Sequence, residues 1–233
     1  MQTKLLLLGS VLLFISCSPF KTIQVLNDEY NTPTKNYDTS ITLLPFTDKI
    51  VTEETLNNYL VNNPAERSLI SQTNRDIFNN YFGLTFSETT TGEVKNLVGA
   101  DQLSFVDELD FIDTTLTLDK KTELSLLIPD KGKLFQTDNP TDYSLLIQSI
   151  VWETTAVEEQ TKPVGGNIVQ RIEFKLRLSY ALWDNRKEAL AGYGLINEKR
   201  YLISLPDRIF YIQFFEEISR MIVRKSPLQE RYR

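Results

Sequence analysis

The strongest pattern in the sequence is an alternation of apolar and polar residues over residues 168–183, IVQRIEFKLRLSYALW. Every second residue in its central part is large and apolar: Ile172, Phe174, Leu176, Leu178, Tyr180 and Leu182. The residues between them are polar: Glu173, Lys175, Arg177 and Ser179. A period of two over this length predicts an antiparallel strand with one face on a core and the other in water.

Two further β-rich runs flank this strand. Residues 143–156, YSLLIQSIVWETTA, start with three large aliphatic residues, which predicts a central strand buried on both faces at its start. Residues 188–202 follow a turn at 184–187 and predict the next antiparallel strand. Gly192 and Gly194 in that strand indicate a close backbone approach or a bulge.

Two helices are predicted to cover the apolar face of these strands. Residues 205–227 have the period of an amphipathic helix, with Phe210, Phe214, Ile218 and Met221 or Ile222 on the buried side. Asn63-Pro64-Ala65-Glu66 has the residues of a helix start, namely a capping Asn, a Pro in the first turn and a Glu that closes a capping box. Gly83 predicts the end of this earlier helix.

The remaining elements are less distinct. We expect strands at 41–46 and 84–89 and a short helix at 52–61, while residues 122–129 fit either a short helix or a strand. The whole order predicts an α+β fold, in which helices pack on one face of a mixed or antiparallel sheet. We expect these elements to form a single domain over 41–227.

The parts of the chain outside that regular order are assigned by composition. We expect an irregular insert at about 90–140. Residues 17–40 are mostly polar with two prolines and predict a flexible tether, within which a short strand at 22–26 is an open alternative.

The first residues have the form of an export signal. Lys4 precedes an apolar stretch of about eleven residues, which is too short to span a bilayer as a helix, since spanning needs about 20. Ser16 then precedes Cys17, the only cysteine of the chain. This arrangement resembles the lipobox of bacterial lipoproteins, although Phe14 stands where Leu is commonest.

The lipobox resemblance implies that residues 1–16 are removed as a signal peptide and that Cys17 carries a covalent lipid (diacylglycerol, and palmitate on the new N-terminus). Ser18, in place of the Asp that retains such proteins in the inner membrane, implies the outer membrane, facing the periplasm. An ordinary secretory signal with a chance cysteine, or a membrane-anchor helix, is the alternative.

Composition excludes several classes of function. The chain contains no histidine, which excludes Ser-His-Asp and Cys-His nucleophilic sites and histidine-based metal sites. Its net charge of −6 makes nucleic acid an unsuitable partner and gives no attraction to an anionic membrane, so membrane attachment depends on the lipid.

The folded part resembles a family of envelope lipoproteins that includes the curli-secretion lipoproteins, the penicillin-binding-protein activator lipoproteins and the TolB N-terminal domain. The resemblance rests on residues 41–46, the helix after them, residues 142–147, the strand pair 172–194 and the closing helix. The auxiliary lipoproteins of lipid-transporting ABC systems share this arrangement. The family implies a non-catalytic domain that binds other envelope proteins.

Few residues qualify as a chemical site. Asp107, Glu108, Asp110 and Asp113 lack the spacing of a calcium loop, so we interpret them as a solvated acidic segment and expect no metal or other cofactor. Tyr211 and Phe215 flank the buried stripe of the last helix and are candidates for partner contacts.

We therefore expect a non-enzymatic, membrane-anchored lipoprotein that serves as an accessory or scaffold in an envelope complex for transport, secretion or cell-wall synthesis. Its partners would be the membrane, through the lipid, and an envelope protein. A surface-exposed lipoprotein that binds external or host ligands is the first alternative. A carboxylate-based hydrolase is the second, because the distance between two carboxylates is invisible in a sequence.

Overall fold

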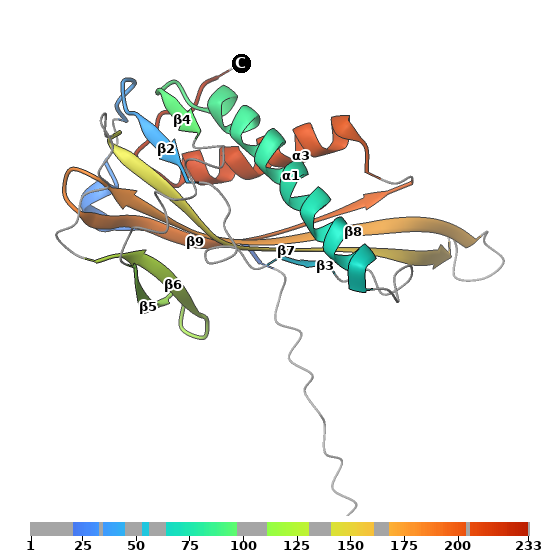
Figure 1. Cartoon of the computed structure of the whole chain (residues 1–233). Helices are drawn as coiled ribbons and strands as arrows, with labels where there is room; N and C mark the ends of the chain where they lie inside the picture. The colour runs from blue at the N-terminus through green and yellow to red at the C-terminus, as the bar shows by residue number, and fades with distance from the viewer. Residues whose placement is uncertain are drawn as a thin grey trace, which may run out of the picture.

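The computed structural model describes residues 21–32, 35–44, 53–55, 64–96, 111–130, 141–160, 168–203 and 206–232. These residues form a seven-stranded mixed sheet, two α-helices packed together on one of its faces, and a two-stranded hairpin against the other face (Figure 1). The strand order is β1-β9-β8-β7-β2-β4, and β3 also pairs with β7. The predicted α+β class is confirmed.

Three long antiparallel strands form the centre of the sheet. They are β7 (Tyr143–Gln160), β8 (Ile168–Asp184) and β9 (Ala189–Leu202), with β8 in the middle. The apolar side of β8 faces the helices and is buried at Phe174, Leu176, Leu178, Tyr180 and Leu182. The period-two prediction is confirmed, because the large apolar residues of one strand face need a cover and the helices supply it.

Shorter strands extend the sheet at both edges. On one side β1 (Ile23–Leu26) pairs antiparallel with β9. On the other side β2 (Ile41–Leu43) and β3 (Glu53–Thr55) pair parallel with β7, and β4 (Val94–Asn96) pairs parallel with β2. The sheet is therefore mixed, with its parallel pairs confined to one side.

Two glycines of β9 allow β1 to approach closely. A Cβ atom on Gly192 would stand 2.9 Å from the carbonyl oxygen of Val25, and one on Gly194 would stand 2.9 Å from the ring of Tyr180. Side chains at these positions would push β1 away from the sheet. The close approach predicted for this pair of glycines is confirmed.

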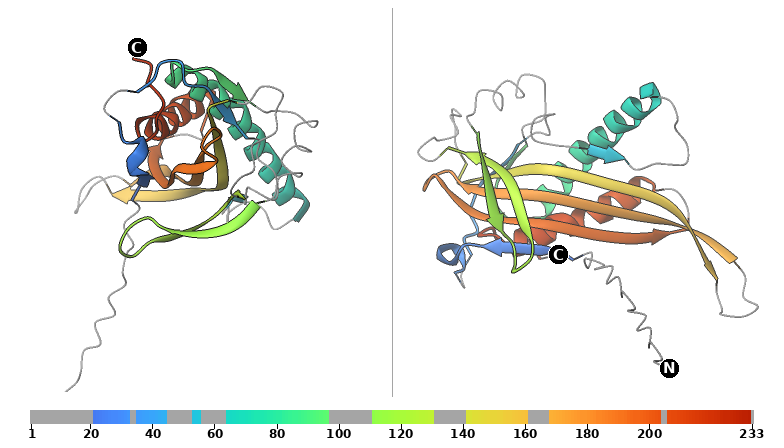
Figure 2. Two further views of the ribbon diagram at one scale, coloured as in Figure 1. Left: turned by 90° about the vertical axis from the view of Figure 1, so that its left-hand side faces the viewer. Right: turned by 90° about the horizontal axis from the view of Figure 1, so that it is seen from below.

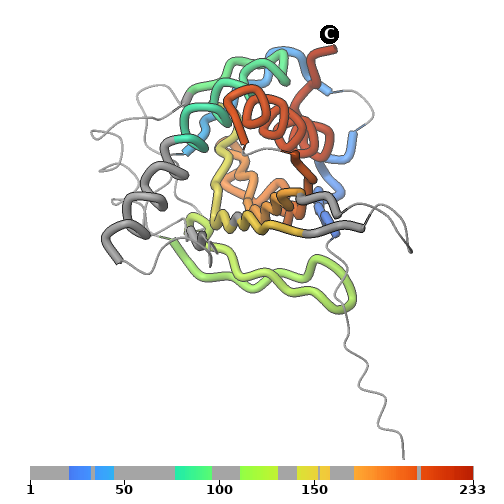
Figure 3. Tube along the Cα trace, turned by 90° about the vertical axis from the view of Figure 1, so that its right-hand side faces the viewer, coloured from blue at the N-terminus to red at the C-terminus, as the bar shows by residue number. Residues whose placement is uncertain are grey.

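The helices α1 (Pro64–Thr89) and α3 (Arg208–Arg224) lie side by side over the sheet (Figure 3). Asp207 caps α3, since its side chain accepts a hydrogen bond from the backbone N–H of Phe210 at 2.8 Å. Aromatic rings fill the space between helices and sheet, as in the edge-to-face pair of Phe174 and Phe214 at 5.1 Å. Within the described residues, neither helix combines the length and the apolarity that crossing a membrane requires.

The hairpin of β5 (Phe111–Thr117) and β6 (Glu123–Pro129) crosses the opposite face near the start of β7 (Figure 2). The side-chain amide of Gln148 donates to the carbonyl of Leu127 and accepts from its N–H, both at 2.8 Å. This face is therefore covered at one end. At the other end it stays polar, as predicted: Glu173 pairs with Lys199 at 3.3 Å.

The structure corrects the prediction for the first helix. α1 does not end at Gly83, and residues 84–89 are its last turns rather than a strand. Phe82 and Phe86 lie one turn apart on the buried side of the helix, which favours its continuation. The hydroxyl of Thr85 donates to the carbonyl of Phe82 at 3.0 Å, so this β-branched residue is accommodated within the helix.

Three assignments of irregular or helical structure also change. Of the helix predicted at 52–61, the described part is strand β3. The predicted tether at 17–40 is too long, because β1 within it belongs to the sheet. The predicted insert at 90–140 is regular over β4, β5 and β6. Pairing with a distant strand orders β1, β3 and β4, whereas β5 and β6 pair with each other as a local hairpin.

Candidate functional site

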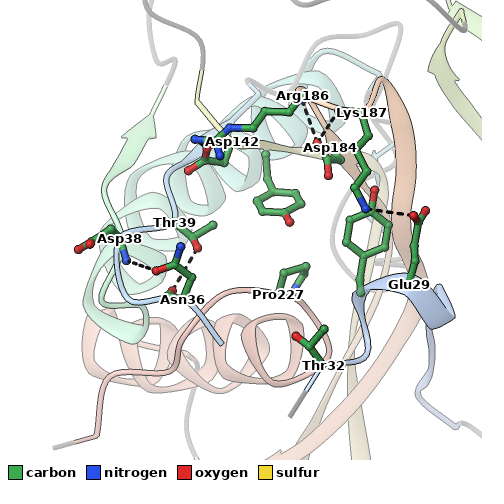
Figure 4. Close-up of a pocket in the computed structure, with 12 residues that line it drawn as sticks. Glu29, Thr32, Asn36, Asp38, Thr39, Asp142, Asp184, Arg186, Lys187 and Pro227 are labelled. Atoms are coloured by element: carbon green, nitrogen blue, oxygen red, sulfur yellow. Dashed lines mark hydrogen bonds and ion pairs between the residues drawn. The ribbon is translucent and has the colours of Figure 1, made fainter. Parts of the chain in front are cut away.

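A polar pocket of about 370 Å³ lies at the end of the sheet where β7 begins and β8 turns into β9 (Figure 4). Two of its lining residues come from the 3-10 turn Asp28–Tyr30. The pocket is lined by Glu29, Tyr30, Thr32, Asn36, Asp38, Thr39, Asp142, Tyr143, Asp184, Arg186, Lys187 and Pro227. Four carboxylates and two cations are among these residues. Segments far apart in the sequence therefore converge on one polar site.

The turn between β8 and β9 shapes one wall. The carboxylate of Asp184 accepts the backbone N–H groups of Arg186 and Lys187, both at 2.8 Å. Glu188 has a φ of 51°, a left-handed conformation that lets the turn close without a glycine. Sequence and geometry agree here, since Asp at the start of a turn captures the N–H groups that follow.

A buried amide joins this turn to the start of β7. The side chain of Asn185 donates to the carbonyl of Thr141 at 2.8 Å and to the hydroxyl of Ser144 at 3.0 Å. Asn185 is 3% exposed. The turn is thus held by side-chain hydrogen bonds that exclude water, and this rigidity fixes the position of Asp184.

Asp142 connects three segments at the pocket wall. Its carboxylate accepts from the backbone N–H of Ser40 at 2.8 Å and from the Ser40 hydroxyl at 3.0 Å. It also forms an ion pair with Arg186, whose side chain is largely exposed. The acid therefore holds the start of β2 and the β8–β9 turn against the start of β7.

Two tyrosines form the aromatic part of the pocket. The rings of Tyr30 and Tyr143 meet edge to face with centroids 6.3 Å apart. The ammonium group of Lys187 lies 4.4 Å from the centre of the Tyr30 ring and pairs with Glu29 at 3.0 Å. This is a cation–π contact closed by a carboxylate.

Both phenols are held neutral. Burial, with the nearby Asp184 carboxylate as a second cause, raises the pKa of Tyr30 well above its ordinary value. Burial also raises the pKa of Tyr143 to about 12, again with Asp184 and Asp142 adding to the effect. The Tyr30 hydroxyl is buried and makes no hydrogen bond within the described residues.

The chemistry of the pocket suits binding better than proton transfer. Asp142 and Asp184 accept hydrogen bonds that maintain the structure, and the phenols stay protonated. A general base needs a free acceptor with a pKa near the working pH. The described part of the chain also gathers no group of three or more acids or cysteines close enough to hold a metal ion.

The two residues that the sequence predicted as partner contacts differ in burial. Phe215 is completely buried, and its ring meets Phe78 of α1 edge to face at 5.0 Å. The predicted partner contact is wrong for Phe215, because α1 packs against the side of α3 on which Phe215 lies. Tyr211 stacks on Tyr81 at 6.3 Å and is only partly buried, so a partner role for it stays a prediction.

The other predicted site residues are placed as follows. Ser16 and Cys17 lie outside the described residues, as do Asp107, Glu108 and Asp110. Asp113 is exposed on β5. The pocket itself was not predicted. Its two structural acids belong to segments that the family resemblance singled out, but no spacing in the sequence shows that 142 and 184 meet.

No family model and no curated protein matches the sequence. Among solved structures, the chain is similar to a PelC dodecamer from Paraburkholderia phytofirmans, at 12% identity and a TM-score of 0.35, covering 91% of this chain and 99% of that one. It is also similar to a neuraminyllactose-binding hemagglutinin homolog from Helicobacter pylori, at 10% identity and a TM-score of 0.35, covering 84% and 89%. These similarities are distant, and no functional conclusion is based on them.

Proposed function

We propose that the protein is a non-enzymatic lipoprotein, anchored through Cys17, that serves as an accessory or scaffold subunit of an envelope complex at the outer membrane. The sequence supports this proposal by placing its only cysteine directly behind an apolar signal-like stretch. Two or more acyl chains on one residue hold a protein stably at a membrane, whereas a single chain does so only marginally.

One structural observation carries the proposal: Lys21, four residues after Cys17, is in direct contact with the sheet. The carbonyl of Lys21 accepts a hydrogen bond from the side-chain amide of Asn197 at 2.7 Å. The hydroxyl of Thr22 donates to the Asn197 carbonyl at 2.9 Å and accepts from its N–H at 3.0 Å. A lipid on Cys17 would therefore hold the sheet itself close to the bilayer, which suits a subunit that works with membrane neighbours.

The pocket favours binding as the mode of action. Asp142 and Asp184 are committed to hydrogen bonds or ion pairs, Glu29 pairs with Lys187, and the phenols are protonated at neutral pH. A carboxylate hydrolase needs one carboxyl group as general acid and another as base or nucleophile. Asp142 and Asp184 serve neither purpose while they hold the β8–β9 turn.

The same pocket supports a second candidate, a surface-exposed lipoprotein that binds an external ligand. The observation in its favour is the buried hydroxyl of Tyr30, which makes no hydrogen bond to the described residues, in a pocket of about 370 Å³. Protease treatment of intact cells separates the two candidates. Loss of the domain supports surface exposure, and its protection supports the periplasmic scaffold.

The test of the main proposal is a crosslinking pull-down from detergent-solubilised membranes. Wild type is compared with Cys17→Ala, which removes the acylation site, and with Ser16→Ala, which keeps a small residue before the cysteine. We expect specific envelope proteins to co-purify with wild type and Ser16→Ala and to be lost with Cys17→Ala. A lipidated protein that is recovered alone from the membrane would contradict the scaffold role.

A further inference from the structure

The end of the molecule opposite the pocket exposes apolar side chains. At the junction of β9 and α3, Tyr201 is 52%, Ile203 89% and Ile209 64% exposed. We name these three residues the β9–α3 tip. In Figure 1 this junction lies at the right-hand end of β9, and the β8–β9 turn beside the pocket lies at its left-hand end. The 14 residues of β9 separate the two ends by about 45 Å.

The anchor residue can reach the tip end but not the pocket end. Lys21 is bound to Asn197, and four residues of extended chain span at most about 14 Å from Lys21 to Cys17. Ala189, at the pocket end of β9, is eight residues or about 26 Å from Asn197 along the strand. Tyr201 is only four residues, or about 13 Å, in the other direction.

The path of the chain agrees with this limit. β1 runs antiparallel to β9, with Ile23 opposite Leu195 and Leu26 opposite Gly192. Thr22 and Lys21, which precede β1, lie beside Asn197 and are therefore nearer to the tip than Ile23 is. The chain thus runs from β1 toward the tip at the last residue described before Cys17.

The tip also has the chemistry of a membrane–water interface. Tyr201 has an apolar ring with a polar end, and the ammonium of Lys199 lies 5.1 Å from the centre of that ring. Lys199 is in turn paired with Glu173 at 3.3 Å. Local charges are thus balanced, in contrast to the acid-rich pocket, so an anionic bilayer surface is not repelled here.

We propose that the β9–α3 tip docks on the lipid bilayer beside the acylated Cys17, so that the pocket points away from the membrane. This inference rests on the proposed function, because the anchor supplies the proximity. Tyr201, Ile203 and Ile209 enter the interfacial layer without spanning it. The pocket, at the far end of the strands, then faces the aqueous compartment and its ligands or partners.

Environment-sensitive probes on the intact lipoprotein test the docking. With Cys17 acylated, a single new cysteine at Ile203 or Ile209 is the only free thiol and can carry a nitrobenzoxadiazole probe. In vesicles of phosphatidylethanolamine and phosphatidylglycerol, we expect both probes to shift to the blue and to lose quenching by iodide. A probe at Tyr37, which is 66% exposed beside the pocket, is the matched control and should remain in water.

Two failures are distinguishable. If mass spectrometry finds no lipid on Cys17 and the protein does not float with vesicles, both the proposed function and the docking are overturned. If the protein is acylated and floats, but probes at 203 and 209 emit and quench like the probe at 37, the docking alone is overturned. Because positions 203 and 209 are exposed, we expect the labelled variants to fold like wild type. Circular dichroism of each variant checks that it is folded.

Discussion

The two ends of the long strands differ in how their side chains are satisfied. At the pocket end, Asp142, Asp184 and Asn185 have their hydrogen bonds within the protein. At the tip end, Ile203 and Ile209 are exposed to water and gain nothing from the fold. These polar groups of the pocket end are therefore paired within the protein, whereas the apolar side chains of the tip end are left uncovered.

Folding stability is therefore expected to depend on the pocket end, and membrane contact on the tip end. Buried polar networks determine one conformation and are costly to break, because each orphaned group loses its hydrogen bonds with water as well. Exposed apolar residues contribute little to folding, and their replacement is usually tolerated. Substitutions at the two ends should therefore affect different measurements.

The largest effect is expected from Asn185→Leu. The change leaves the carbonyl of Thr141 and the hydroxyl of Ser144 without their buried partner, which costs about 3 kcal/mol of unfolding free energy. Urea denaturation measures it. The matched change at the other end, Ile203→Asp, should alter the unfolding free energy by less than about 0.5 kcal/mol. Similar values for both variants would contradict the distinction between the ends.

A smaller, pH-dependent effect is expected from Glu230→Gln, near the C-terminal end of α3. Arg224 and Arg220 hydrogen-bond to Glu230 and hold the pKa of its carboxyl below the ordinary value. A lowered pKa in the folded state stabilises the protein above the unfolded pKa of about 4.3, and this contribution is lost as pH falls through the folded pKa.

Denaturation of both proteins between pH 7 and pH 3 measures this contribution. Wild type should exceed Glu230→Gln by about 1.5 kcal/mol at pH 7, as for hydrogen bonds to charged groups, and the difference should shrink below pH 4. A difference that stays constant down to pH 3 would show that the carboxylate charge has no part in it.

Sequence reasoning succeeded where one strand face or helix face decides the structure. The alternation in β8 and the stripe of Phe214, Ile218 and Ile222 in α3 reflect burial against a single neighbour, so their periods are visible. It failed for β3 and left β1 only as an open alternative, because three or four residues that pair with a distant strand carry no period of their own. It also failed at Gly83, where a buried glycine inside a helix looks like a helix end.

The candidate site was not visible in the sequence for a related reason. Asp142 and Asp184 are 42 residues apart and meet only because β7 and β8 pair with Tyr143 opposite Asp184. Phe215 was misjudged because its cover, Phe78, lies on a helix far away in the chain. Registers and helix–helix contacts of this kind are tertiary facts that local patterns do not contain.

Two separate buried tyrosines, Tyr180 and Tyr30, allow a hydroxyl with a hydrogen bond to be compared with a hydroxyl that has none within the described residues. Tyr180→Phe removes a buried hydroxyl that accepts from the Gln24 amide at 2.8 Å, and should cost about 1 kcal/mol. Tyr30→Phe removes a hydroxyl that makes no hydrogen bond to any described residue, and should change the unfolding free energy by less than about 0.5 kcal/mol. A cost for Tyr30→Phe equal to that for Tyr180→Phe would show that the pocket hydroxyl is already satisfied.

The smallest effect on folding is expected from Ile203→Asp combined with Ile209→Asp. Because both side chains are exposed, unfolding in detergent-free buffer should change by less than about 0.5 kcal/mol. In vesicles the same variant should lose the blue shift of a probe placed at position 201, since two carboxylates resist entry into the interfacial layer. A control variant with aspartate at the exposed Leu84 of α1 should keep that shift. If the tip docks on the membrane, the double variant loses the blue shift and keeps its unfolding free energy. A lower unfolding free energy would instead show that Ile203 and Ile209 contribute to the stability of the fold.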